Sequence, residues 1–224
     1  SHNPRLEPEL TRDANGEWLK KSSPGINSMT LEMLKSYDVG RLNPATRYAE
    51  RYPEQQGLDG VQVPTLNEVF ELANKSGNQS VRFNIEVKSN PEYPELTLPP
   101  EKFVAAVIKV VRSHEMGDRV SLQSFDWQVL QAVQDLAPDV TTSYLTANQR
   151  WLNNLQTGMP GPSPWLNGLD IDNFDGNAAR AIKAAGGDIW SSYHQEVDAD
   201  AIKNAHALGL KVSVWTVNET GRMR

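Results

Sequence analysis

The sequence predicts a parallel α/β fold, and within that class a TIM-type (β/α)8 barrel, present here as a partial barrel. Three observations support this prediction. From residue 64 onward, strand and helix patterns alternate, as they do in βαβ units. The predicted strands keep one polar face, whereas the central strands of a doubly wound open sheet are apolar almost throughout. Gly-x-Gly-x-x-Gly and Walker fingerprints are absent, which counts against a nucleotide-binding open sheet.

Residues 1–63 are the least regular part of the chain. Turn signals at 13–16 and 22–25 predict loop and hairpin, and residues 30–37 predict a short helix. The polar, Pro- and Gly-containing stretch 38–63 predicts an irregular loop of a length that usually covers a site. We therefore expect a single barrel domain over residues 1–224, with 1–63 as a hairpin and loop insertion region within it.

The elements that follow are signalled by caps and periodicity. Thr65 and Glu68 form a capping box that opens an amphipathic helix. Strand 81–88 follows, and Pro99 and Pro100 open a second helix that ends near Gly117. The remaining predictions are strands at 120–125, 140–145, 189–193 and 211–217, helices at 126–137, 177–185 and from Asp198 or Asp200 to Leu208, a loop at 147–168, and a strand or extended edge at 168–172.

Strand 81–88 alternates strictly, which places Glu86 and Lys88 on its polar face. In a barrel these two residues lie at the carboxyl end of the strand, where such folds keep their chemistry, roughly 6.6 Å apart. The carboxylate could hold a cation while the ammonium meets an anionic substrate group. The alternative is a surface Glu–Lys pair worth about 0.5 kcal/mol.

Composition excludes several classes of function. The net charge is −6, from 22 basic and 28 acidic residues, and no basic stripe is present, so we expect no nucleic-acid partner. No apolar run is long enough to predict a transmembrane segment. The absence of cysteine excludes disulfides, thiolate metal sites and a cysteine nucleophile.

Five segments together resemble the glycerophosphodiester phosphodiesterase family. The first is Asn84-Ile85-Glu86-Val87-Lys88, preceded by a Val-Pro-Thr-Leu-Asn-Glu-Val stretch at 63–69. The others are a histidine motif at 2–6, a strand at 122–125, and an Ala-His segment at 205–210 leading to Val-Trp-Thr-Val-Asn at 214–218. The order and spacing of these segments agree with the family along nearly the whole chain.

This resemblance implies a TIM-type barrel that hydrolyses glycerophosphodiesters to sn-glycerol 3-phosphate and an alcohol, with a divalent metal, Ca²⁺ or Mg²⁺, and a pair of histidines. By position, His2 matches a catalytic histidine and Glu86 a metal-ligand glutamate. Lys88 matches a phosphate-contacting lysine, and Trp215 a tryptophan that lines the substrate site. The family usually has Asp after this histidine, whereas this chain has Asn3, which argues against a carboxylate role there.

The resemblance also implies family segments that this sequence does not contain. A His-Arg-Gly strand and a Glu-x-Asp strand would precede His2, and one strand would follow residue 218. We therefore expect residues 1–224 to be a fragment that is not a stable, active enzyme by itself, because a barrel without three strands exposes unpaired edges. Similar family members favour a periplasmic or secreted location.

Several other residues are considered for a place near the site. We expect Gln123 and Phe125 to pack in the barrel next to the site, and His194, just after a strand, could reach the barrel mouth. His114 and His206 fall on helices and predict structural roles. One rival function is a glycoside hydrolase that uses two carboxylates, for example Glu86 with Asp172. Asp170 and Asp172 are both candidate carboxylates, in a loop that the family resemblance does not explain. A second rival is a non-catalytic barrel that acts as a binding module.

Overall fold

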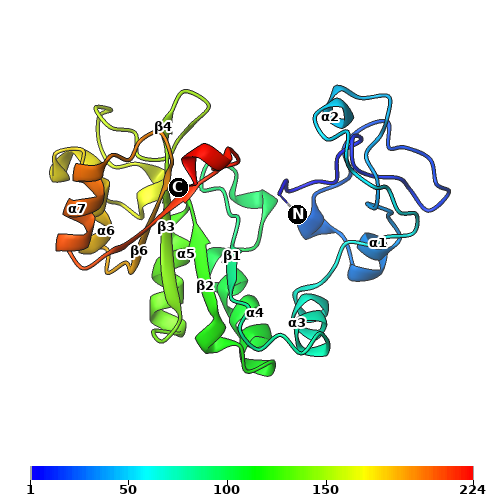
Figure 1. Ribbon diagram of the computed structural model, residues 1–224, viewed down its shortest axis with the longest axis horizontal. Coiled ribbons are helices and arrows are strands. Elements are labelled where there is room, and N and C mark those ends of the chain that lie inside the picture. The colour runs from blue at the N-terminus through cyan, green and yellow to red at the C-terminus, as the bar shows by residue number, and fades with distance from the viewer. Residues whose placement is uncertain (1, 224) are drawn as a thin grey trace. The chain divides into compact units, whose positions relative to one another are not determined.

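The computed structural model describes residues 2–223, which form two compact units (Figure 1). The N-terminal unit contains the described residues up to Gly77 together with Glu95–Thr97. The sheet unit contains Asn78–Pro94 and the described residues from Leu98 onward. The single domain with a 1–63 insertion region stays a prediction.

The N-terminal unit contains short elements joined by irregular chain. They are η1 (Ile26–Ser28), α1 (Leu31–Lys35), α2 (Arg47–Glu50) and α3 (Leu66–Lys75). The predicted helix at 30–37 is confirmed as α1, and the Thr65–Glu68 capping box opens α3 as predicted. The predicted irregular loop at 38–63 is interrupted by α2, a single turn whose N-cap, Thr46, makes no side-chain capping bond, so little in the local sequence indicated it.

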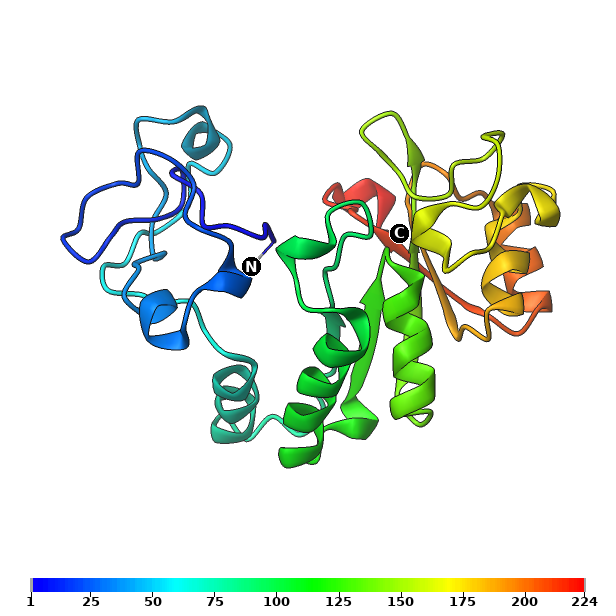
Figure 2. The ribbon, with the colours of Figure 1, turned by 180° about the vertical axis from the view of Figure 1, so that it is seen from behind.

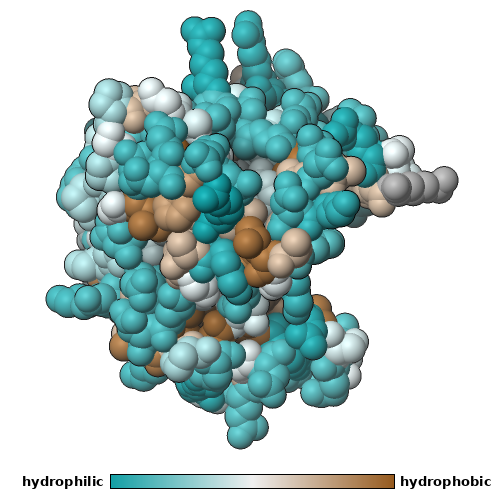
Figure 3. Space-filling model, turned by 90° about the vertical axis from the view of Figure 1, so that its left-hand side faces the viewer, coloured by the Kyte–Doolittle hydropathy of each residue, from teal (hydrophilic) through white to brown (hydrophobic). Residues whose placement is uncertain are grey.

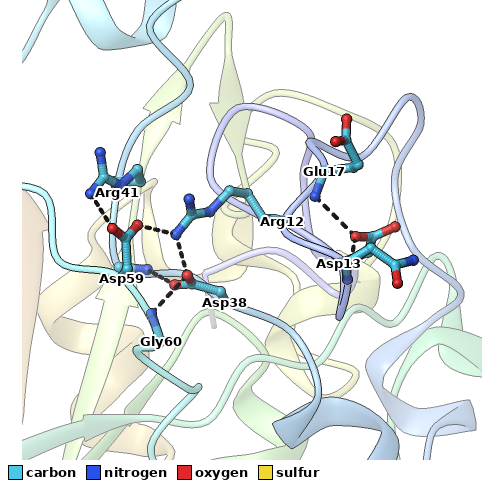
Figure 4. Close-up of polar contacts among 9 residues, drawn as sticks. Arg12, Asp13, Glu17, Asp38, Arg41, Asp59 and Gly60 are labelled. Atoms are coloured by element: carbon cyan, nitrogen blue, oxygen red, sulfur yellow. Dashed lines mark hydrogen bonds and ion pairs between the residues drawn. The ribbon is translucent and has the colours of Figure 1, made fainter.

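A network of charged side chains holds the irregular chain of the N-terminal unit together (Figure 4). Arg12 forms ion pairs with Asp38 and Asp59, and Arg41 pairs with Asp59 at 2.9 Å. The carboxylate of Asp38 also accepts the backbone N–H of Gly40 at 2.9 Å and of Gly60 at 2.8 Å. Burial raises the pKa of Asp38, but these two N–H groups and Arg12 outweigh it and lower that pKa to about 2.

We expect Asp38→Asn to lower the stability of the protein by about 2 kcal/mol, because backbone donors and Arg12 lose a charged partner. Asp59→Asn is the matched control, since its side chain is 66% exposed, and we expect a clearly smaller loss of stability than for Asp38→Asn. Because folding lowers the pKa of Asp38 from its ordinary value of 3.8, the ionised carboxylate stabilises the folded protein at pH values above 3.8. That stabilisation is lost as the pH falls toward 2. Urea unfolding at pH 7 and at pH 2.5 measures both effects. Equal losses for the two variants at pH 7 would contradict the assignment.

The sheet unit is built on five parallel strands in the order β1-β2-β3-β6-β7, as a partial barrel requires. A second, antiparallel sheet consists of β4 and β5 alone. The strands are β1 (Phe83–Glu86), β2 (Val120–Ser124), β3 (Thr141–Thr146), β4 (Asn148–Gln149), β5 (Leu152–Asn153), β6 (Ile189–Tyr193) and β7 (Lys211–Trp215). The helices are α4 (Pro100–Ser113), α5 (Trp127–Leu136), α6 (Ala178–Ala184) and α7 (Ala199–Ala207). The short 3-10 turns are η3 (Gly117–Arg119), η4 (Pro164–Leu166), η5 (Ile171–Phe174) and η6 (Thr220–Arg222). A further turn, η2 (Pro94–Leu96), has residues in both units.

The helices cover one face of the five-stranded sheet and bury the core there. Helices α4 and α5 lie on the same side of the strands, behind them in Figure 1 and in front in Figure 2, while α6 contacts β6 and α7 contacts β7. Leu122, Tyr144 and Trp190 point into this layer, and the rings of Trp127 and Tyr144 meet edge to face at 4.9 Å. The opposite face carries Glu86, Gln123 and Ser143, which are neighbours in register. The polar face that the sequence predicted is therefore the face without helices.

Three helices of the sheet unit start at side-chain caps, among them the predicted start at Asp198. The side chains of Asp126, Asn177 and Asp198 each accept a backbone N–H at the start of α5, α6 and α7. The predicted strand or edge at 168–172 is wrong. Asp170 accepts the N–H of Asp172 and starts η5 instead, a local side-chain bond that competes with extended structure.

Figure 3 shows hydrophilic side chains over most of the face on which α6 and α7 lie, with apolar patches between them. The longest helix among residues 2–223 is α4, with 14 residues. No helix in that range combines the length and the apolar character needed to cross a membrane.

Gly187 lies where α6 leads into β6, pressed against two buried side chains. A Cβ at this position would meet Cγ2 of Ile182 at 2.6 Å and Cδ2 of Tyr144 at 2.7 Å. We expect Gly187→Ala to cost about 1 to 3 kcal/mol of stability, because the close-packed core must shift. Gly221→Ala, where a Cβ would meet nothing within 4 Å, should change stability by less than about 0.5 kcal/mol. Urea denaturation of the two variants measures the difference, and a neutral Gly187→Ala would refute the packing argument.

Candidate functional site

Glu86 and Lys88 point together at the carboxyl end of β1. Glu86 is the last residue of the strand, and the Lys88 ammonium lies 2.8 Å from Oε1 of Glu86. The two side chains are 24% and 31% exposed, so the pair is half-buried rather than fully solvated. The strict alternation of the sequence predicted this juxtaposition, and β1 is a parallel strand as that prediction required.

The segment that carries Lys88 is fixed by hydrogen bonds to β2 and to the start of α5. Val87 is buried, donates its N–H to the Gln123 carbonyl at 2.9 Å and accepts the Ser124 hydroxyl at 2.8 Å. The hydroxyl of Ser89 then donates to the carboxylate of Asp126 at 2.6 Å. Burial raises the pKa of Asp126, against the opposing effect of its hydrogen bonds. Lys88 is thus flanked by two hydrogen-bonded residues, the buried Val87 and the half-buried Ser89.

The polar face next to the pair is also hydrogen-bonded. Asn84 donates to Gln123 Oε1 at 2.7 Å and accepts the Ser121 hydroxyl at 2.9 Å. Gln123, which is next to Glu86 in register, therefore supports the wall beside the pair.

An aromatic cluster, defined here as Phe125, Trp151, Tyr193 and Trp215, lies where β2, β6 and β7 end. The Trp215 ring centroid is 5.4 Å from Phe125, 5.5 Å from Tyr193 and 6.0 Å from Trp151, and the rings of Trp151 and Tyr193 are 5.3 Å apart. The Trp215 indole N–H donates to the Ser191 carbonyl at 3.2 Å, which fixes the ring. Sequence reasoning missed Trp151 and Tyr193 as members of this site. The available signal was a tryptophan in the long 147–168 loop and an aromatic residue at a strand end.

His194 adjoins the aromatic cluster. Its backbone N–H donates to the Trp215 carbonyl at 2.8 Å, and its ring lies 4.9 Å from that of Tyr193. Nδ1 of His194 is buried and has no hydrogen-bond partner within residues 2–223. His206 is exposed on α7, and His114 is the C-cap residue of α4, so both occupy helical positions as expected.

His2 belongs to the N-terminal unit, whereas Glu86, Lys88 and Trp215 belong to the sheet unit. The His2 side chain is exposed, and its Nδ1 lies 3.2 Å from the amide oxygen of Asn3. A proton on Nδ1 would donate to that oxygen and leave Nε2 as an acceptor. The amide of Asn3 can orient the imidazole in this way without adding charge.

The carboxylates suggested for a glycosidase have local structural bonds. Both carboxylate oxygens of Asp172 lie 3.0 Å from the backbone N–H of Gly158, and Asp170 caps η5. These contacts tie the 147–168 loop to η5 and account for both residues.

A divalent cation is implied by the resemblance, and the described residues do not supply a full set of ligands for one. Ca²⁺ takes about six to eight oxygen ligands, several of them usually carboxylates, whereas Mg²⁺ is octahedral and is usually held by one or two carboxylates and several waters. Among residues 2–223 no three His, Asp or Glu side chains are grouped closely enough to hold a metal ion. Glu86 is a single carboxylate, and the Lys88 ammonium already lies against it.

A parallel sheet with helices on one face and ionised side chains at a strand's carboxyl end is the architecture of TIM-type α/β barrels, represented here in part. Residues 2–224 match the model of the glycerophosphoryl diester phosphodiesterase family, and the chain belongs to this family. A glycerophosphodiester phosphodiesterase of Bacillus subtilis is 29% identical over 184 residues, which are 75% of this chain and 60% of that protein. One of Caldanaerobacter subterraneus is 29% identical over 222 residues, 95% of this chain and 72% of that protein.

Solved structures agree with this assignment. A Silicibacter pomeroyi protein, provisionally named a glycerophosphoryl diester phosphodiesterase, is 34% identical with a TM-score of 0.82, over 100% of this chain and 70% of that one. A phosphodiesterase of Oleispira antarctica, solved in complex with the product sn-glycerol-3-phosphate, shares the fold with a TM-score of 0.62 at 19% identity. That match covers 98% of this chain and 67% of the other. The expected family and fold class are thereby confirmed.

Proposed function

We propose that the complete protein hydrolyses glycerophosphodiesters to sn-glycerol 3-phosphate and an alcohol. The observation that carries this proposal is the half-buried Glu86–Lys88 pair at the carboxyl end of a parallel strand, in a chain of this family. The relatives named as glycerophosphodiester phosphodiesterases support it, as does the Oleispira protein that binds sn-glycerol-3-phosphate.

The Lys88 ammonium is the proposed phosphate contact. It carries a compact positive charge on a segment fixed by Val87 and Ser89, so it can neutralise a phosphoryl oxygen without first being ordered. Glu86 holds the ammonium at 2.8 Å and sets its position. Trp215, fixed through its indole N–H, is the proposed wall against the organic part of the substrate.

His2 is the proposed acid–base residue. Hydrolysis requires a proton to leave the attacking water and a proton to reach the departing alkoxide, and imidazole can serve either purpose near neutral pH. With Nδ1 directed at Asn3, Nε2 is the nitrogen that would exchange the proton.

We also propose Glu86 as one carboxylate ligand of Ca²⁺ or Mg²⁺, an ion that neutralises phosphoryl charge when bound. A complete site needs ligands in addition to Glu86, and the proposed roles of Lys88 and His2 do not depend on the ion.

An assay for release of glycerol 3-phosphate from glycerophosphocholine by the complete protein, with and without EDTA, tests the proposal. We expect release that EDTA suppresses and that added Ca²⁺ or Mg²⁺ restores. No release under any of these conditions would overturn the proposal and favour the non-catalytic binding module.

A further inference from the structure

Trp151 stands at the turn of a short hairpin that is anchored at its base. The hairpin pairs β4 with β5, and the carboxylate of Glu196 accepts the Asn148 N–H at 2.8 Å and the Gln149 side-chain amide at 2.6 Å. Figure 1 shows it beyond the end of β3. The hairpin is thereby tied to the segment between β6 and α7.

A second anchor lies directly after β5. Asn154 is fully buried, donates to the carbonyls of Phe125 at 3.2 Å and Leu145 at 3.0 Å, and accepts the Ala147 N–H at 2.9 Å. Its carbonyl accepts the Ser163 hydroxyl at 2.7 Å. The loop that carries Trp151 is therefore cross-linked to the ends of β2 and β3, which fixes its position before any ligand arrives.

Trp151 remains 61% exposed even though its ring contacts those of Tyr193 and Trp215. Polar anchors rather than burial hold it in place, and much of the indole surface is open to solvent. A large exposed aromatic side chain on a fixed hairpin is typical of a recognition surface rather than of a core.

The aromatic cluster begins at the end of β2, the strand paired with the one that leads to Lys88. Glu86 pairs with Gln123 in register, and Lys88 and Phe125 each follow two residues later, so both leave the carboxyl ends of the neighbouring strands β1 and β2. Phe125 contacts Trp215, and Trp215 contacts Trp151. A phosphodiester held at Lys88 would thus have a row of rings leading away from its phosphate.

We propose that Trp151, with Tyr193 and Trp215, forms a subsite for a trialkylammonium group on the alcohol portion of the substrate. A trialkylammonium has no N–H and needs no hydrogen-bond acceptor, so ring faces can bind it through cation–π attraction. A primary ammonium carries three donors and a glycerol carries hydroxyl groups, and both need polar partners that ring surface does not supply. The net charge of −6 also favours a cationic group over an anionic one. This inference rests on the proposed phosphodiesterase function.

A titration with tetramethylammonium chloride tests the subsite without any catalysis. In protein carrying ¹⁵N-labelled tryptophan, we expect the indole signals of Trp151 and Trp215 to shift, while those of Trp127 in the core and Trp18 in the N-terminal unit stay unchanged at matched NaCl. Trp151→Leu should abolish the shift at Trp215, whereas Met159→Ala, which changes a 50% exposed side chain in the same loop, should retain it. No shift at Trp151, or an undiminished Trp215 shift in Trp151→Leu, would overturn the inference.

The second measurement is the ratio of kcat/KM for glycerophosphocholine to kcat/KM for glycerophosphoethanolamine. We expect Trp151→Leu to lower this ratio about 5- to 30-fold and Trp151→Phe to retain most of it, because only the latter keeps a ring face. An equal fall for both substrates would refute selectivity at this subsite. If neither substrate is hydrolysed by the unaltered protein, the proposed function fails, and the titration still decides the subsite.

Discussion

Lys88→Met lowers kcat/KM for glycerophosphodiester hydrolysis by about 100-fold or more, on the proposed function. The change removes the ammonium while keeping an unbranched chain of similar length, and loss of one preorganised electrostatic contact typically costs that much. Lys88→Arg should recover only part of the activity, because a planar guanidinium does not reproduce a point charge 2.8 Å from Glu86. Steady-state kinetics with glycerophosphocholine measures the effect.

Lys109→Met is the matched control, since Lys109 is exposed on α4, and it should change kcat/KM less than about twofold.

Glu86→Gln keeps the shape of the side chain and removes the charge that holds Lys88. We therefore expect the double variant to be little worse than Lys88→Met alone, because residues that act as one unit are not additive. Unchanged kcat/KM in Lys88→Met with the fold intact would exclude Lys88 as the phosphate contact.

Local features of the fold followed directly from the sequence, because a cap or an alternating strand is decided by neighbouring residues. Thr65, Asp126 and Asp198 each start a helix with a side-chain bond to a nearby N–H. The placement of Glu86 beside Lys88 needed only the two-residue period of a strand.

Features that depend on distant parts of the chain could not be predicted in the same way. Trp151 contacts Tyr193 and Trp215 because Glu196 and Asn154 anchor its hairpin. Both ring partners lie more than 40 residues from Trp151 in the sequence, and so does Glu196. The error at 168–172 had the opposite cause. A local hydrogen bond, from the Asp172 N–H to the Asp170 carboxylate, formed a turn in the stretch for which a strand or extended edge was predicted.

His2→Asn should lower kcat by about 10²- to 10⁴-fold, the range for removing a general acid or base, with a smaller change in KM. The side chain is exposed and forms its ring contact with the adjacent Asn3, so the substitution should leave stability within about 0.5 kcal/mol. His206→Asn on α7, also exposed, is the matched control and should keep kcat within twofold. Added imidazole should restore part of the activity of His2→Asn and none in the control.

The leaving group identifies the step in which His2 transfers a proton. If His2 protonates the departing alkoxide, a p-nitrophenyl ester of glycerol 3-phosphate, whose leaving group needs no proton, should be cleaved almost as fast by His2→Asn as by the unaltered protein. If His2 removes a proton from the attacking water, the loss should be equally large for both substrates, because the attack is the same. A His2→Asn variant with full activity on both substrates would show that the histidine motif at 2–6 resembles the family's without performing its acid–base step.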